Sequence, residues 1–124
     1  MKLLVDTSVW IHHFRYGLPD LVAALSADRV LTHPVVIAEI ACGTPPQRAT
    51  TLGYLENLSV TQIATQAETL AFIERERLFG LGCGWIDLSL LASVMLTPRA
   101  RLWTLDQRLQ GLAQRFGVLQ GSVH

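Results

Sequence analysis

Short apolar segments alternate along this chain with longer segments that begin and end at helix-capping residues. Residues 3–5 (LLV) form the first apolar run, and the next segment opens at the helix-capping residues Asp6, Thr7 and Ser8 and closes at Gly17. A repeated strand-then-helix order favours a parallel sheet with helices on both faces. We therefore predict one α/β domain over residues 1–124, built on a central parallel sheet of four to five short strands.

The pattern also predicts where the individual elements lie. Strands are expected at residues 2–5, 29–32, 59–63 and 101–105, with 118–120 as an edge strand. Helices are expected at residues 9–16, 19–27, 34–42, 47–58, 65–78, 85–96 and 106–116.

Four of the ten acidic residues lie within or directly after apolar segments. Asp6 and Asp106 each follow a predicted strand, whereas Glu39 and Asp87 interrupt apolar helices. Carboxylates are rarely buried unless they are paired or bound to a metal. Since ligands of a parallel sheet bind outside the carboxyl ends of its strands, we expect Asp6 and Asp106 at that edge. The pattern alone does not direct Glu39 and Asp87 to the same place.

Gathering these carboxylates would have a chemical consequence. Neighbouring carboxylates repel and raise one another's pKa unless a cation neutralises them. Oxygen ligands favour Mg²⁺ or Mn²⁺, which retain part of their water shell in proteins. Such a cluster is typical of sites for metal-assisted phosphodiester cleavage.

Each acid also has an ordinary structural explanation when it is considered alone. Asp6 and Asp106 stand at helix N-caps, and Asp87 stands in a first helical turn, where the helix dipole favours a carboxylate. Glu39 has the weakest such explanation because its helix is otherwise apolar from residue 35 to 42, so we expect it to be buried for function. One shared site explains all four positions better than four coincidences.

The amino-acid composition limits the partners and the cellular location that we expect for this protein. Half of the residues are apolar, 16% are charged, and the net charge is zero. We therefore expect a partner or a second copy to cover some apolar surface, and we expect nucleic-acid binding only through a local basic patch. Cys42 and Cys83 share no metal-binding spacing and are expected as buried free thiols in a reducing cytosol. The N-terminal apolar run is too short for a signal peptide and no stretch is long enough to span a membrane, which predicts a cytoplasmic protein.

Other catalytic motifs are absent from the sequence. There is no P-loop or G-x-G-x-x-G motif, and Ser8 and Ser89 have no histidine in a nucleophile motif. The adjacent His12 and His13 point in different directions on a helix and are expected at the surface. Core packing is the expected role of the three tryptophans, with stacking of one of them on a base as the alternative: Trp10, Trp85 and Trp103.

Four segments carry a family resemblance. They are residues 5–11 (VDTSVWI), 39–43 (EIACG), 84–93 (GWIDLSLLAS) and 102–109 (LWTLDQRL). In this order they resemble the motifs of PIN domains, particularly the VapC toxins of bacterial toxin–antitoxin pairs, and the resemblance covers essentially the whole chain. It implies a PIN-like domain with Mg²⁺- or Mn²⁺-dependent ribonuclease activity. It also implies a homodimer that is inhibited by a small VapB-like antitoxin.

The resemblance assigns roles by position. It makes Asp6, Glu39, Asp87 and Asp106 the metal-binding and catalytic acids. Ser8 and Thr104 match hydroxyl residues that support the site in the family. The implied reaction is hydrolysis of RNA by metal-activated water, which leaves a 3′-hydroxyl and a 5′-phosphate.

An acidic site must also attract an anionic RNA, and arginine is suited to bidentate phosphate contacts. The arginines nearest to the motifs in sequence are the candidates for this role: Arg15, Arg99, Arg101 and Arg108.

Two alternatives stay open at the level of sequence. A DNA nuclease or a phosphatase would use the same four acids. A metal-free binding module would use them to capture an arginine-rich partner. Metal dependence and substrate preference distinguish these alternatives from a ribonuclease.

Overall fold

The computed structural model describes residues 1–121 and contains one four-stranded parallel sheet in the order β3-β2-β1-β4. The predicted α/β class and parallel sheet are confirmed. The strands are β1 (Lys2–Val5), β2 (Val30–Thr32), β3 (Ser59–Val60) and β4 (Ala100–Trp103). The predicted edge strand at residues 118–120 is reduced to a single parallel bridge between Leu102 and Leu119.

The two central strands, β1 and β2, are mostly buried and apolar. Leu3, Leu4 and Val5 of β1 are buried, as are Val30 and Leu31 of β2. Continuous apolar strands of this kind are expected where helices cover both faces of a parallel sheet.

The helices follow the predicted order, with ends that differ by at most two residues. They are α1 (Thr7–Tyr16), α2 (Pro19–Ser26), α3 (Pro34–Ala41), α4 (Arg48–Glu56), α5 (Gln66–Glu76), α6 (Trp85–Leu96) and α7 (Gln107–Arg115). Thr65 and Glu68 form a capping box at the start of α5, and Asp6 and Asp106 cap α1 and α7.

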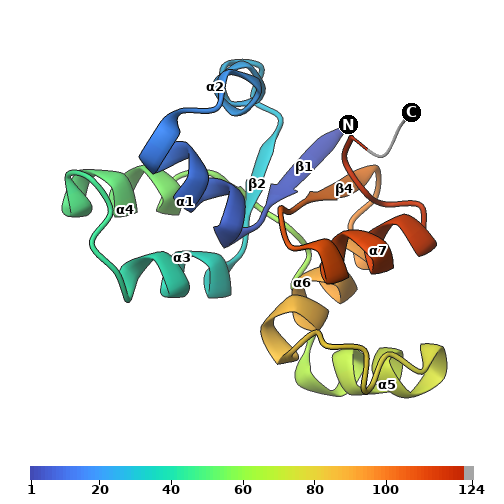
Figure 1. Ribbon diagram of the computed structural model, residues 1–124. Helices are drawn as coiled ribbons and strands as arrows, with labels where there is room; N and C mark the ends of the chain where they lie inside the picture. The colour runs from blue at the N-terminus through green and yellow to red at the C-terminus, as the bar shows by residue number, and fades with distance from the viewer. Residues whose placement is uncertain (122–124) are drawn as a thin grey trace.

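The order of the strands divides the helices between the two faces. The chain moves outward from β1 to β2 and β3, and then returns past β1 to form β4. Because parallel crossovers are right-handed, this reversal places the later helices on the opposite face. Figure 1 shows α1, α3 and α4 to the left of the strands, and α5, α6 and α7 to the right and below.

Two strands end earlier than the sequence pattern predicts, for the same physical reason. After β3, the N–H of Thr61 still donates to the Thr32 carbonyl of β2 at 3.1 Å. The N–H groups of Gln62 and Ala64 donate at 3.0 Å each to the hydroxyls of Thr97, the C-cap of α6, and Ser93 of α6. After β4, the N–H of Leu105 donates to the Ser8 hydroxyl at 3.0 Å, and that of Asp106 donates to Thr104 Oγ1 at 3.1 Å. Side-chain acceptors thus replace the sheet ladder at its carboxyl edge.

No helix within residues 1–121 is long and apolar enough to cross a membrane.

Candidate active site

The site lies at the carboxyl ends of the neighbouring parallel strands β1 and β4. Here the strand order switches, because β2 and β3 lie on one side of β1 and β4 lies on the other. Such switch points are where parallel α/β sheets bind ligands. Asp6 directly follows β1, and its N–H donates to the Trp103 carbonyl at the end of β4, at 2.9 Å. The sheet register therefore fixes the position of the Asp6 backbone.

The Asp6 carboxylate is buried and accepts three hydrogen bonds. Oδ1 accepts from the N–H of Thr7 at 2.7 Å, while Oδ2 accepts from Ser8 Oγ at 2.9 Å and Thr104 Oγ1 at 2.7 Å. Ser8 and Thr104, the predicted supporting hydroxyls, therefore hold one orientation of this carboxylate.

Glu39 is linked to the helix that follows Asp6 by Thr7, which the sequence indicated only as a helix-capping residue. Thr7 Oγ1 donates to Glu39 Oε1 at 2.6 Å, which links α1 to α3. Glu39 is only partly buried, less than the sequence predicts. Its side chain lies at the edge of a groove and is held there by Thr7.

Asp87 lies near the other three acids, and their charges affect its pKa. Its pKa is raised, first by partial burial and then by the charges of Asp6 and Asp106, with a smaller contribution from Glu39. A hydrogen bond from the Gly84 backbone partly opposes this increase in the pKa. Asp87 therefore lies close enough to Asp6, Asp106 and Glu39 to be repelled by each of them.

Asp106 is exposed, and its Oδ1 accepts from the N–H of Leu109 at 3.0 Å at the start of α7. Asp106 therefore caps α7 and also lies near Asp87. Within residues 1–121 the ion pairs join Arg75 and Arg115 to Glu76, so none of the four acids has an ion-pair partner there.

The chemistry of the donors fits a hard divalent cation. The acids and hydroxyls offer only oxygen atoms, which Mg²⁺ and Mn²⁺ prefer. In the described part of the chain, no three His, Cys, Asp or Glu side chains are placed together so that they could hold a metal ion. Mg²⁺ usually keeps several waters and binds directly to only one or two carboxylates. A site of two direct carboxylates, with other acids acting through water, is compatible with this placement.

The structure separates the four candidate arginines. Arg99 precedes β4, and its carbonyl accepts from the N–H of Lys2 at 3.1 Å, so it lies at the edge of the sheet opposite the acids. Arg101 lies within β4 and donates to the Leu119 carbonyl at 3.4 Å. Neither of these two arginines is brought to the acid cluster.

Arg108 and Arg15 lie near the acids. Arg108 packs against Gly82: a Cβ atom added at Gly82 would stand 2.6 Å from both Cδ and Nη1 of Arg108. Arg15 lines a groove together with Glu39. Gly82 has a positive φ of +89° and packs against Arg108, and both features favour glycine in the loop between α5 and α6.

Cys83 lies between these charged groups. Its pKa is raised by burial and by the charges of Asp87 and Asp106, and the charge of Arg108 opposes this. Cys83 is partly buried and Cys42 is exposed, so the expectation of two buried thiols was wrong.

The tryptophans have three different environments. Trp10 is buried in the core, as predicted, and Trp103 is partly buried against it. Trp85 is 43% exposed at the start of α6, so its prediction as a core residue was wrong.

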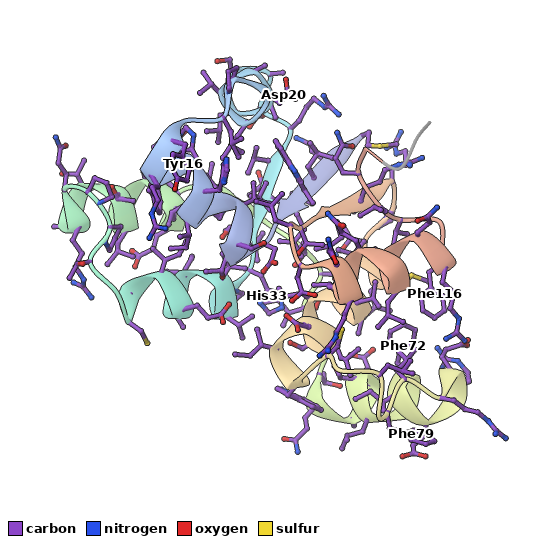
Figure 2. The ribbon with its side chains drawn as sticks, in the orientation of Figure 1. Tyr16, Asp20, His33, Phe72, Phe79 and Phe116 are labelled. Atoms are coloured by element: carbon purple, nitrogen blue, oxygen red, sulfur yellow. The ribbon has the colours of Figure 1, made fainter. Side chains whose placement is uncertain are left out.

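His33 was not identified from the sequence, although it is buried at the end of β2. Figure 2 shows it between α3 and α6. The available signal was its position: a polar residue between a strand and a helix-starting proline, at the same edge as Asp6 and Thr104.

No protein-family model matches the chain. Two relatives are similar across most of its length, both called Ribonuclease VapC32, from Mycobacterium tuberculosis strains CDC 1551 / Oshkosh and ATCC 25618 / H37Rv. Each is 45% identical over 116 residues, which cover 94% of this chain and 94% of the relative. With this identity over almost the full length of both proteins, and with the four acids gathered at one edge of a parallel sheet, the chain belongs to the VapC family.

Proposed function

We propose that this protein is a Mg²⁺- or Mn²⁺-dependent endoribonuclease that acts as the toxin of a toxin–antitoxin pair. The observation that carries the proposal is the proximity of Asp87 to the three other acids, none of which has an ion-pair partner within residues 1–121. The similarity to Ribonuclease VapC32 over 94% of the chain supports RNA as the substrate. A cytoplasmic location and a homodimer stay predictions.

Different side chains have different roles in the proposed reaction. Asp6, Glu39, Asp87 and Asp106 would hold the divalent ion, which when bound supplies a more acidic water and positive charge for the phosphate. Asp6 is held by its three donors, and Glu39 is held by the Thr7 hydroxyl. One carboxylate accepts the proton of the attacking water. Such pre-organised geometry lowers the barrier without further rearrangement.

The test of the proposed substrate compares three matched oligonucleotides with the same base sequence: all RNA, RNA with one 2′-deoxy sugar at the scissile position, and all DNA. A water nucleophile does not need the neighbouring 2′-hydroxyl, so the singly substituted RNA should still be cleaved. Intact DNA would support recognition through the 2′-hydroxyls of RNA. Equal cleavage of DNA would instead support the DNA-nuclease alternative.

We assign Arg108 to a phosphate of the RNA. It lies over Gly82 beside the acid cluster, is exposed, and has no ion-pair partner among the described residues. Arg108→Ala should reduce kcat/KM by about tenfold or more, because a hydrogen bond to a charged group contributes roughly 1.5–3 kcal/mol.

Arg77, which is exposed at the end of α5, supplies the control for the Arg108 assignment: Arg77→Ala should leave the kinetics unchanged. Wild-type kcat/KM in Arg108→Ala would contradict the assignment.

A groove beside Glu39 is our proposed antitoxin site. It has a volume of about 340 Å³ and is lined by residues of α1 and α3 and the loop that follows α3: Ile11, Phe14, Arg15, Glu39, Ile40, Gly43, Thr44, Pro45 and Pro46. An apolar groove of this kind accepts an amphipathic helix, and an arginine of that segment would reach Glu39.

Ile11→Asp should weaken antitoxin binding by about tenfold or more, because Ile11 is 43% exposed in this groove. Val22→Asp is the matched control, since Val22 is 50% exposed on α2 and does not line the groove. Affinity for the neighbouring gene's product can be measured by calorimetry. A loss of affinity equal in both variants would contradict this site.

A further inference from the structure

His33 lies outside the acid cluster but joins the two helices that carry Glu39 and Asp87. It follows β2, caps α3, and is buried with 3% of its surface exposed. Its Nδ1 accepts from the N–H of Val35 at 3.1 Å, and its Nε2 lies 3.1 Å from Ser93 Oγ of α6. The imidazole therefore connects α3 on one face of the sheet to α6 on the other.

The partners of Ser93 fix the protons in this network. Ser93 Oγ donates its one hydrogen to the Ser89 carbonyl at 2.8 Å and accepts from the N–H of Ala64 at 3.0 Å. Because a hydroxyl has one proton, it must also accept from His33 Nε2. Because a backbone N–H only donates, Nδ1 of His33 must be unprotonated.

Both contacts therefore require the neutral imidazole with its proton on Nε2. Burial lowers the pKa of His33, which favours this neutral form. A protonated Nδ1 would point at the N–H of Val35 at the start of α3, where the helix dipole also disfavours a positive charge.

The two ends of the network, His33 and Ser93, are separated from Glu39 and Asp87 by the same number of residues. Glu39 is six residues after His33, and Asp87 is six residues before Ser93, which corresponds to about 9 Å along each helix. Within residues 1–121, the His33–Ser93 contact is the side-chain hydrogen bond that links α3 or its cap to α6. A shift between these helices would alter the separation of the two carboxylates.

We infer that His33 is a positioning residue, which sets the distance between the helices of Glu39 and Asp87 through its hydrogen bond to Ser93. The inference rests on the proposed ribonuclease function. Displacements of about 1 Å at a catalytic group can reduce rates by roughly a hundredfold. His33 itself touches neither the acids nor, by its position, the RNA.

Two substitutions separate the bridging role of His33 from its capping role. His33→Asn keeps an acceptor near Nδ1 and is a good N-cap, but its shorter side chain does not reach Ser93. His33→Gln keeps an N–H donor near Nε2 but caps poorly. Both residues tolerate the extended backbone that precedes Pro34.

We expect the two variants to rank in opposite orders. His33→Asn should have the higher Tm but a kcat reduced by about tenfold or more, with KM changed by less than about twofold. His33→Gln should have the lower Tm but retain most of kcat. Ser93→Ala should lower kcat as His33→Asn does, and the double variant should lower it little further.

The matched control is His13, whose Nδ1 also accepts a backbone hydrogen bond, from Leu18 at 3.0 Å, without a link to α6. In His13→Asn any change in activity should follow the change in Tm. If kcat in the His33 variants also follows Tm, with His33→Asn the more active, the positioning role is overturned. Absence of cleavage by the wild type would instead overturn the proposed function.

The tautomer can be measured without RNA, metal or activity. In ¹⁵N NMR spectra of the wild-type protein at neutral pH, His33 should show an unprotonated Nδ1 and a protonated Nε2. A protonated Nδ1 would exclude the network and overturn the inference, whatever the kinetics of the variants.

Discussion

Replacing Asp87 by Asn is expected to reduce RNA cleavage by about a thousandfold, since metal and charge stabilisation of the transition state contributes several kcal/mol. The same change should raise the Tm of the metal-free protein. Partial burial and the charges of Asp6 and Asp106 all disfavour the ionised Asp87 carboxylate. An amide of the same shape removes that repulsion. Loss of a catalytic carboxylate together with a gain in stability would be difficult to attribute to misfolding.

The pH dependence of this gain follows from the raised pKa of Asp87. An acid with a raised pKa in the folded state binds its proton more tightly there than in the unfolded chain. Stability therefore falls as pH rises from the ordinary aspartate pKa through the raised value. The Tm advantage of Asp87→Asn should be largest at neutral pH and should disappear as pH falls through that window. Thermal unfolding with a chelator tests this, and a lower Tm of the variant at neutral pH would contradict it.

Asp6 offers a less clean comparison, although it belongs to the same cluster. Its carboxylate accepts from the backbone of Thr7 and from the Ser8 and Thr104 hydroxyls. An amide nitrogen in place of Oδ2 would face two hydroxyl donors. Asp6→Asn should therefore abolish cleavage but also lower Tm, so its effect on activity combines two causes.

Mg²⁺ or Mn²⁺ should stabilise the folded wild-type protein by about 2.7 kcal/mol at a free concentration about a hundred times Kd, because only the folded state gathers the acids. This is the second large expected effect. Asp87→Asn should lose most of this gain. Asp20→Asn, an exposed acid in the first turn of α2, should keep all of it.

The measurement is Tm as a function of divalent-ion concentration for these three proteins. Equal shifts in the wild type and Asp87→Asn would show that the ion binds elsewhere. A Tm independent of both ions in the wild type would favour the metal-free binding module.

The parts of the site that follow directly from strand ends could be predicted from the sequence. Asp6 and Asp106 follow apolar runs, and the carboxyl ends of parallel strands share one edge. The places of Glu39 and Asp87 could not be derived in this way, because the rotation of a helix against a sheet depends on packing. Their assignment came from the family resemblance, and the structure brings their charges near the other two.

Contacts between segments that are far apart in the sequence could not be predicted from the sequence pattern. Thr7 looked like a capping residue, yet its hydroxyl holds Glu39, 32 positions along the chain. His33 and Ser93 are 60 positions apart and have no sequence spacing that joins them. Burial of single residues was also overestimated for Glu39 and Trp85, because apolar neighbours in sequence do not determine which face of a helix is covered.

The most direct test of the proposed acid site is the chemistry of the RNA ends that it produces. Purified wild-type protein with Mg²⁺ or Mn²⁺ should generate internal breaks with 5′-phosphate and 3′-hydroxyl ends, mapped by sequencing of ligated 5′-phosphorylated fragments. Chelation of the ion or Asp87→Asn should remove these ends. Breaks with 5′-hydroxyl and cyclic phosphate ends, or breaks of equal yield in Asp87→Asn, would contradict metal-assisted hydrolysis at the four acids.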